Sequence, residues 1–251
     1  AAAARPGPTF RTFAHNDIER AGERAARHLR GNPNAIVWLV SESVFSMDGD
    51  LADLPALAAL RDRLGRAALL LDEAHATGIL GPGGAGLDAA HGHVADVIVS
   101  TASKALGSLG GIISGPHEAI AAIHNFARSH IYSTAPPPTQ AAAIGAALEV
   151  IHNEPQRRER LAALVRRVRE SLREAGWDVE IQTEHPTPII PLIVGGADEA
   201  IALAAQLREQ GFFAPAIRPP TVAPNTARVR LSLHCDLSDE ELGRLVEVVR
   251  R

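Results

Sequence analysis

Short apolar runs alternate with amphipathic stretches along residues 1–153, and this alternation constrains the fold more than any other feature. Four runs have the length and composition of buried strands. They cover residues 35–40, 67–71, 94–100 and 111–114. Stretches with helical periodicity cover residues 54–64, 116–128 and 138–151. The alternation predicts an α/β fold, and the almost continuous apolar runs predict mostly parallel strands that are covered on both faces.

The pattern changes after about residue 153. A long Arg/Glu-rich helix is predicted first, and strand-like segments follow it around one further helix. The two helices cover residues 155–175 and 198–210, and the strand-like segments cover residues 177–181, 189–194, 212–217 and 229–233. Ser238 and Glu241 have the spacing of a capping box that opens a last helix. We therefore predict two domains, residues 1–153 and a smaller α+β domain at residues 154–251.

Composition excludes several classes of protein. The formal charge of −4 over 251 residues indicates neither nucleic acid nor an anionic membrane as a partner. The longest apolar run, residues 141–151, is too short to span a bilayer, and the first eight residues lack the pattern of a secretion signal. Cys235 is the only cysteine, so no intrachain disulfide forms. These features predict a cytoplasmic protein.

Metal binding is not indicated. His91 and His93 stand one residue apart in a glycine-bearing segment, a spacing more typical of plain loop residues than of metal ligands. We predict no metal site.

Lys104 is the only lysine in the chain, because arginine supplies the other 24 of the 25 basic residues. A guanidinium stays protonated and cannot replace an amine that must lose its proton and attack a carbonyl. The count alone leaves two interpretations open, a chance survivor and a functional lysine. The neighbouring residues have to decide between them.

The string DEAH at residues 72–75 matches a helicase motif. A helicase needs an upstream phosphate loop of the form G-x-x-x-x-G-K-[ST]. The only lysine lies downstream, in TASK at residues 101–104, without that glycine spacing. The helicase interpretation is therefore rejected.

Lysine-based cofactor chemistry explains the same residues better. Pyridoxal phosphate needs a carboxylate that keeps its ring nitrogen protonated, and Asp72 ends an apolar strand where it can serve. The alternative for Asp72 is a helix cap. Thr101 and Ser103 flank Lys104 with hydroxyls suited to a phosphate, and His75 can contact the ring.

A second candidate group lies near the end of the chain. Arg218 is followed by two prolines, which fix the backbone and could hold the guanidinium ready for a substrate carboxylate. An ordinary solvated loop arginine is the alternative.

Five ordered motifs resemble the α-oxoamine synthases, which are pyridoxal-phosphate enzymes of fold type I. They are ESVFSMDGD (42–50), DEAHATG (72–78), TASKALG (101–107), IYSTAPPP (131–138) and AIRPPTV (216–222). The resemblance runs from about His15 to the C-terminus. It implies a fold type I transferase, with residues 1–153 as the C-terminal part of the large cofactor-binding domain and residues 154–251 as the small domain.

The resemblance also implies a role for each matching residue. Lys104 would join the cofactor as a Schiff base and act as the catalytic base, Asp72 would pair with the ring nitrogen, and His75 would contact the phenolic oxygen. Ser46 would lie at the cofactor and Thr101 at its phosphate. Thr134 would reach the cofactor phosphate in the other subunit of a homodimer. Arg218 and Thr221 would bind the substrate.

The block at residues 216–222 is most like the biotin-pathway member of the family. That likeness implies L-alanine and a pimeloyl thioester of coenzyme A or acyl carrier protein as substrates. A family member that uses glycine, and an inactive fragment, remain alternatives. The family normally carries further residues before the HND segment at 15–17, and residues 1–12 fit it poorly, so we expect a partial chain. Residues 222–225 and 237–238 also depart from the usual pattern, which leaves the acyl group open.

Overall fold

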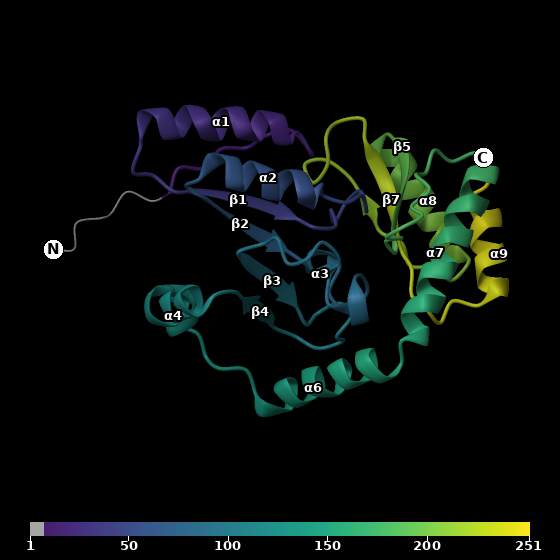
Figure 1. The fold of residues 1–251 in the computed structure, drawn as a ribbon. Coiled ribbons are helices and arrows are strands. Elements are labelled where there is room, and N and C mark those ends of the chain that lie inside the picture. Colours follow the sequence, from purple (N-terminus) through teal and green to yellow (C-terminus); the bar gives the residue numbers. More distant parts are fainter. Residues whose placement is uncertain (1–7) are drawn as a thin grey trace.

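The apolar runs of the first part form one four-stranded sheet in the order β1–β2–β3–β4 (Figure 1). The computed structural model describes residues 8–251, so residues 1–7 of the poorly matching start lie outside it. The strands are β1 (Val37–Glu42), β2 (Ala67–Asp72), β3 (Val97–Thr101) and β4 (Gly111–Ser114). The first three are parallel and β4 is antiparallel to β3, which confirms a mostly parallel sheet.

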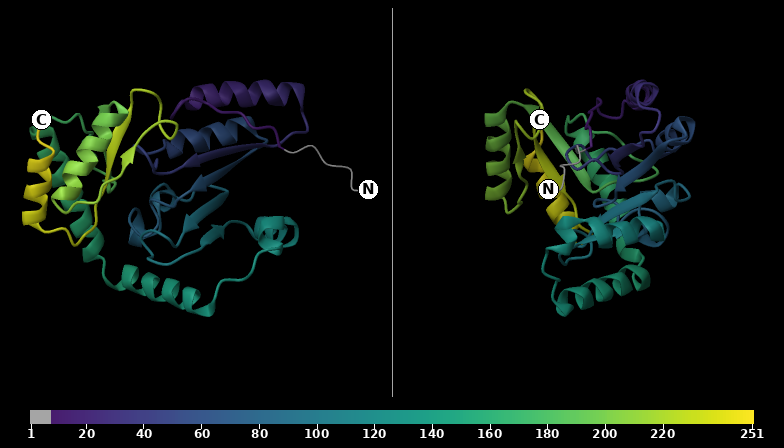
Figure 2. Two further views of the ribbon diagram at one scale, coloured as in Figure 1. Left: turned by 180° about the vertical axis from the view of Figure 1, so that it is seen from behind. Right: turned by 90° about the vertical axis from the view of Figure 1, so that its left-hand side faces the viewer.

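Helices α1 (Ile18–Gly31) and α2 (Leu54–Leu64) lie against one face of this sheet (Figures 1 and 2). Leu57 and Leu60 of α2 join Leu39, Leu69 and Leu71 of the strands in one buried apolar cluster. The predicted helix at residues 54–64 is confirmed, and its start is capped by the Asp53 carboxylate. Helix α1 was not predicted, because its many charged residues hide a narrow stripe of buried alanine and glycine.

The prediction that both faces of the sheet are covered is wrong for the described residues. Successive strand side chains point to opposite faces, so the neighbours of buried Leu39 lie on the other side. Trp38, Val40 and Ile113 are 52%, 57% and 44% exposed. The nearby helices α4 (His117–Phe126) and α6 (Pro138–Asn153) contain no buried residue among those described. An apolar sheet face therefore stays open beside them.

Short helices connect the longer elements. They are the 3-10 helix η1 (Pro82–Gly84), α3 (Leu87–Ala90) and α5 (Arg128–Ile131). No helix in residues 8–251 combines the length and apolarity needed to cross a membrane.

The second part of the chain forms a three-stranded antiparallel sheet in the order β5–β7–β6. Its strands are β5 (Ile189–Gly195), β6 (Ala216–Ile217) and β7 (Ala227–Ser232), and its helices are α7 (Gln156–Glu174), α8 (Ala197–Glu209) and α9 (Asp239–Val248). Val168, Leu172, Leu192 and Val229 lie in its buried core. The capping box of Ser238 with Glu241 is confirmed at the start of α9.

Two strand predictions in this part are wrong or too long. Residues 177–181 form no strand, although Trp177 and Val179 are buried. The Trp177 indole donates to the Val249 carbonyl. This segment therefore packs against the end of α9 instead of pairing with another strand. The predicted strand at 212–217 is reduced to Ala216–Ile217.

The turn at residues 45–50 joins the two parts. The Gly49 carbonyl accepts hydrogen bonds from Gln182 Nε2 at 2.8 Å and from the Thr187 hydroxyl. Gly49 has φ +71°, and a Cβ there would clash with the backbone of Ile189. The close approach of the two parts therefore depends on the missing side chain.

We expect Gly49→Ala to lower the free energy of unfolding by about 3 kcal/mol or more, because it adds a backbone clash to a left-handed conformation. Gly65→Ala is the matched control, since Gly65 has a similar φ of +66° but open space around it. The control should cost only about 1 kcal/mol. Equal losses in urea unfolding would show that the contact with Ile189 is unimportant.

Candidate active site

The parallel strands place their last residues side by side at one edge of the sheet. Glu42 ends β1, Asp72 ends β2 and Thr101 ends β3, and the register pairs Glu42 with Asp72 and Asp72 with Val99. The loops that follow these strands carry Ser46, His75 and Lys104. Ligands of open α/β sheets bind at this carboxyl edge.

The loop that carries Lys104 folds back on itself. Ala102 N–H donates to the Gly110 carbonyl at 2.9 Å, and Ser108 N–H donates to the Ala102 carbonyl at 2.8 Å. The hydroxyls of Thr101 and Ser103 lie 2.8 Å apart. The loop therefore holds two hydroxyls close together, directly before Lys104 in the chain.

The surroundings of Lys104 alter its acidity. The residue is open to solvent on one side, yet partial burial lowers the pKa of its amine. The negative charges of Asp72 and Glu42 oppose this effect, and the positive charge of Arg230 adds to it. Burial is the largest of these causes, so the amine gives up its proton more readily than an ordinary lysine does.

His75 lies in the same charged cluster. Burial lowers its pKa to about 4, the charges of Lys104 and Arg230 add to the shift, and Asp72 opposes it. The imidazole is therefore neutral at pH 7. Asp72 Oδ1 accepts a hydrogen bond of 2.8 Å from the Ala74 N–H, which shapes the turn between Asp72 and His75.

Glu73 fixes this turn from behind. Its carboxylate is buried and accepts hydrogen bonds from the N–H groups of Leu87 and Asp88 at 2.8 and 3.0 Å. Its own N–H donates to the Val99 carbonyl of β3 at 2.7 Å. Burial raises the pKa of Glu73. Asp72 and His75 thus project from a turn with several hydrogen bonds.

Two charged residues of the cluster were missed in the sequence. Glu42 accepts a hydrogen bond of 2.9 Å from the Ser46 N–H. Arg230 reaches the site from β7, and burial lowers the pKa of its guanidinium. Among the described residues, its buried Nε has no hydrogen-bond partner. The signal in the sequence was the alternation of Arg228 and Arg230 with apolar residues, which places two arginines on one face of a strand.

Three predicted site residues are not brought to this cluster by any contact within residues 8–251. Arg218 and Thr221 are exposed in the loop after β6, where the Thr221 N–H donates to the Arg218 carbonyl at 3.0 Å. Thr134 is exposed between α5 and α6. Their predicted roles stay predictions.

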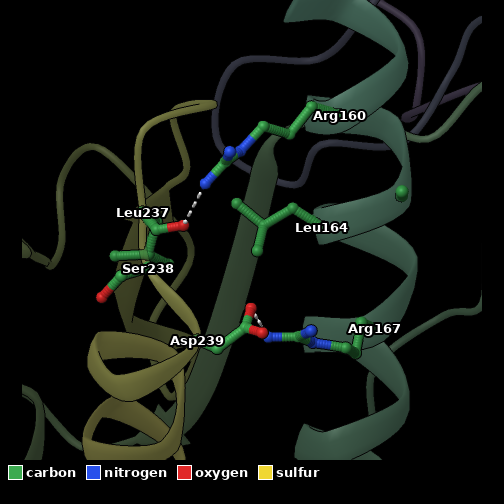
Figure 3. A pocket seen from close by; sticks show the side chains of 7 residues that line it. Arg160, Leu164, Arg167, Leu237, Ser238 and Asp239 are labelled. Atoms are coloured by element: carbon green, nitrogen blue, oxygen red, sulfur yellow. Dashed lines mark hydrogen bonds and ion pairs between the residues drawn. The ribbon is translucent and has the colours of Figure 1, made fainter.

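A pocket of about 550 Å³ lies apart from the cluster, between α7 and the start of α9 (Figure 3). Arg167 reaches across it to Asp239 at 2.5 Å, and Arg160 donates to the Leu237 carbonyl at 3.5 Å. Its arginines are thus already engaged, and Lys104 does not line it.

Potential metal ligands come together once in the described part of the chain, where atoms of His15, Asp48 and Asp50 lie within 4.8 Å of one another. Arg228 pairs with Asp48, and His15 Nε2 lies 2.7 Å from Asp50. Both carboxylates therefore have protein partners.

Comparison with known proteins identifies the family. A family model described as aminotransferase class I and II matches residues 2–249. The chain belongs to the aminotransferase class I and II family.

Curated members of this family include similar proteins named 8-amino-7-oxononanoate synthase. The one from Stutzerimonas stutzeri is 42% identical over 246 residues, covering 97% of this chain and 60% of that protein. The one from Halorhodospira halophila is 40% identical over 243 residues, covering 92% and 60%. The chain thus spans about three fifths of the length of these relatives.

Solved structures agree on the fold. A serine palmitoyltransferase from Sphingomonas wittichii is 28% identical, with a TM-score of 0.86. The match covers 94% of this chain and 58% of that protein's chain. The 8-amino-7-oxononanoate synthase of Francisella tularensis is 24% identical with a TM-score of 0.77, covering 96% and 67%, which supports the fold alone. The fold is that of the fold type I pyridoxal-phosphate-dependent transferases, as the sequence predicted.

We expect the free energy of unfolding to fall as the pH drops from about 6.5 to about 4, in part because of His75. An unfolded histidine takes up a proton near pH 6.5, whereas folded His75 resists protonation down to about pH 4. His75→Gln should remove this part of the pH dependence in chemical unfolding, and the exposed His117→Gln is the control. An identical pH dependence in wild type and His75→Gln would contradict the shift.

Proposed function

We propose that this chain carries the catalytic residues of a pyridoxal-phosphate-dependent acyltransferase. The reaction condenses L-alanine with a pimeloyl thioester, giving 8-amino-7-oxononanoate, carbon dioxide and the free thiol of coenzyme A or acyl carrier protein. The observation that carries this proposal is the cluster of Lys104, Asp72, His75 and Arg230 at the carboxyl edge of the parallel sheet. The names of the relatives give the product, and the likeness of residues 216–222 to the biotin-pathway member implies the substrates.

The residues present fit pyridoxal phosphate. The cofactor needs an amine for its aldehyde, an acid for its ring nitrogen and donors for its phosphate. Lys104, Asp72 and the hydroxyls of Thr101 and Ser103 supply these in adjoining loops. The buried, unpartnered Nε of Arg230 is the donor left over for an anionic group of the substrate.

When bound, pyridoxal phosphate would supply an aldehyde that condenses with amines and a ring that accepts electrons from the substrate's α-carbon. Lys104 would hold the cofactor until the amino acid displaces its amine. The freed amine would then take the α-proton, and the burial that lowers its pKa favours the unprotonated form that this step needs.

Asp72 and His75 would control protons around the ring. The Asp72 carboxylate would hold a proton on the ring nitrogen by charge pairing. The neutral His75 imidazole would share a hydrogen bond with the phenolic oxygen without adding a positive charge there. Both side chains stand on the turn that Glu73 fixes, so their spacing is preorganised.

Arg230 would bind the carboxylate of the amino acid. A partly buried guanidinium forms stronger charge-assisted hydrogen bonds than a solvated one, and Arg230 is half-buried whereas Arg218 is exposed. Ser46 would contact the cofactor, and Thr221 would line the substrate site.

The wider assembly is part of the same proposal. Thr134 lies on the exposed segment before α6 and would reach the cofactor phosphate of a second copy, which makes the unit a homodimer. We place the domain boundary between residues 153 and 154, where α6 gives way to α7. A cytoplasmic location is in keeping with the single cysteine.

We expect Lys104→Ala to abolish the visible absorption band that pyridoxal phosphate acquires when it joins a lysine. Lys104→Arg is the matched variant, since it keeps the positive charge but cannot form the bond. Both should lose the band in titrations of the purified gene product. A band of unchanged intensity in Lys104→Ala would refute the role of this residue, and no saturable binding to the wild type would favour an inactive fragment.

Arg230→Gln should weaken alanine binding by about tenfold or more, because it removes a charge-assisted hydrogen bond. The comparison is Arg218→Gln, which should have little effect. Calorimetric titration of the cofactor-loaded gene product measures both. If Arg218→Gln loses affinity and Arg230→Gln does not, the carboxylate belongs to the loop that the sequence indicated.

The amino acid can be tested against the alternatives within the family. Alanine, glycine and serine are supplied separately with the same thioester, and the amino ketones are identified by mass. We expect the alanine product to predominate. Predominance of the glycine product would assign the chain to another α-oxoamine synthase.

A further inference from the structure

We propose that the ion pair between Asp48 and Arg228 is a positioning device for the amino-acid carboxylate, because it sets the place of Arg230 over the site. This inference rests on the proposed function and deepens it. Asp48 touches neither cofactor nor substrate, and it would act only through β7.

Arg228 and Arg230 lie on the same face of β7. Side chains two residues apart in a strand point the same way, and Val229 between them lies in the buried core of the second part. The two arginines therefore face the first part of the chain. Arg230 lies close enough to His75 and Lys104 that its charge helps to lower their pKa values, and close enough to Glu42 that this carboxylate opposes the lowering of the pKa of Arg230 by burial.

Arg228 is held by the turn at residues 45–50. Its side chain is only 6% exposed, and it pairs with the Asp48 carboxylate and donates to the Met47 carbonyl at 3.3 Å. It also donates to the Thr226 carbonyl at 3.1 Å, just before its own strand begins. A buried guanidinium with partners on both sides cannot shift without leaving one of them unpaired.

The same turn is attached to the site at its other end. Ser46 N–H donates to Glu42, and Ser43 N–H donates to the Asp72 carbonyl at 2.9 Å. The turn closes through the Gly49 N–H, which donates to the Phe45 carbonyl at 2.8 Å. A short rigid path therefore runs from the ends of β1 and β2 to Arg228.

The second part of the chain contacts the turn at one more point. The Gly49 carbonyl accepts from Gln182 and Thr187, just before β5 begins, and β5 pairs with β7 through Pro191 opposite Arg230. The turn thus fixes both β5 and β7. Asp48 supplies the only ion pair among these described links, so its removal should move Arg230 while leaving the other contacts in place.

The test is a double-mutant cycle on alanine affinity in the complete gene product loaded with pyridoxal phosphate, measured by calorimetry. The variants are Asp48→Asn, Arg230→Gln and both together. Asp239→Asn is the matched control, because it breaks the exposed Arg167–Asp239 pair in the same part of the chain. Asp48→Glu keeps the carboxylate and tests rescue.

We expect Asp48→Asn to weaken alanine binding about threefold to tenfold with cofactor affinity unchanged, and to have almost no further effect once Arg230 is replaced. Asp48→Glu should restore most of the affinity, and Asp239→Asn should not change it. In hydrogen exchange, the Arg230 amide, which donates to the Pro215 carbonyl at 3.1 Å, should exchange faster in Asp48→Asn only.

Equal weakening by Asp48→Asn with and without Arg230, or no weakening at all, would overturn the inference. If Arg230→Gln itself leaves alanine binding intact, the assigned carboxylate site is wrong and this inference falls with it. Weakening by Arg230→Gln but not by Asp48→Asn leaves the proposed function standing and removes the inference alone.

Discussion

The electrostatic balance between the Lys104 amine and two nearby carboxylates is the interaction on which the site depends. Lys104 lies after β3, and Asp72 and Glu42 end the two strands beside it, so only a parallel arrangement of the three strands brings these charges together. Burial makes the charged amine less favourable, while the carboxylates stabilise it. The balance leaves an amine that gives up its proton more readily than an ordinary lysine does, near the Asp72 carboxylate.

The second part of the chain adds one charged residue to this cluster from a single strand. β7 carries Arg230 to the carboxylates, and its neighbour Arg228 is tied to the turn at residues 45–50. Gly49 permits the close approach on which these contacts depend. If Arg230 binds the substrate carboxylate as proposed, that binding is linked to the packing between the two sheets rather than to the exposed loop of Arg218.

Much of this was predictable from local pattern. The helix at residues 54–64 has clear periodicity, a cap at Asp53 and a glycine at its end. The apolar runs matched the strands because each run is about as long as the strand that it forms. Lys104 was identified because it is the only lysine, Asp72 because it ends an apolar strand, and His75 because it follows three residues later. Arg230 and Glu42 were missed, because the alternation around Arg230 places it on one face of a strand but does not show which part of the chain that face meets, and no spacing pointed to Glu42. The segment around Trp177 was wrongly predicted to be a strand, since a buried side chain need not belong to a strand of a sheet.

The pH dependence of labelling at Lys104 tests the central claim most directly, since the chain has no other lysine. A small amine-reactive reagent is applied across a pH series, and the peptide that contains Lys104 is quantified by mass spectrometry, apart from the terminal amine. We predict a labelling midpoint below the ordinary lysine value of 10.5, and a still lower one in Asp72→Asn. A midpoint at or above 10.5 that does not respond to Asp72→Asn would contradict the account.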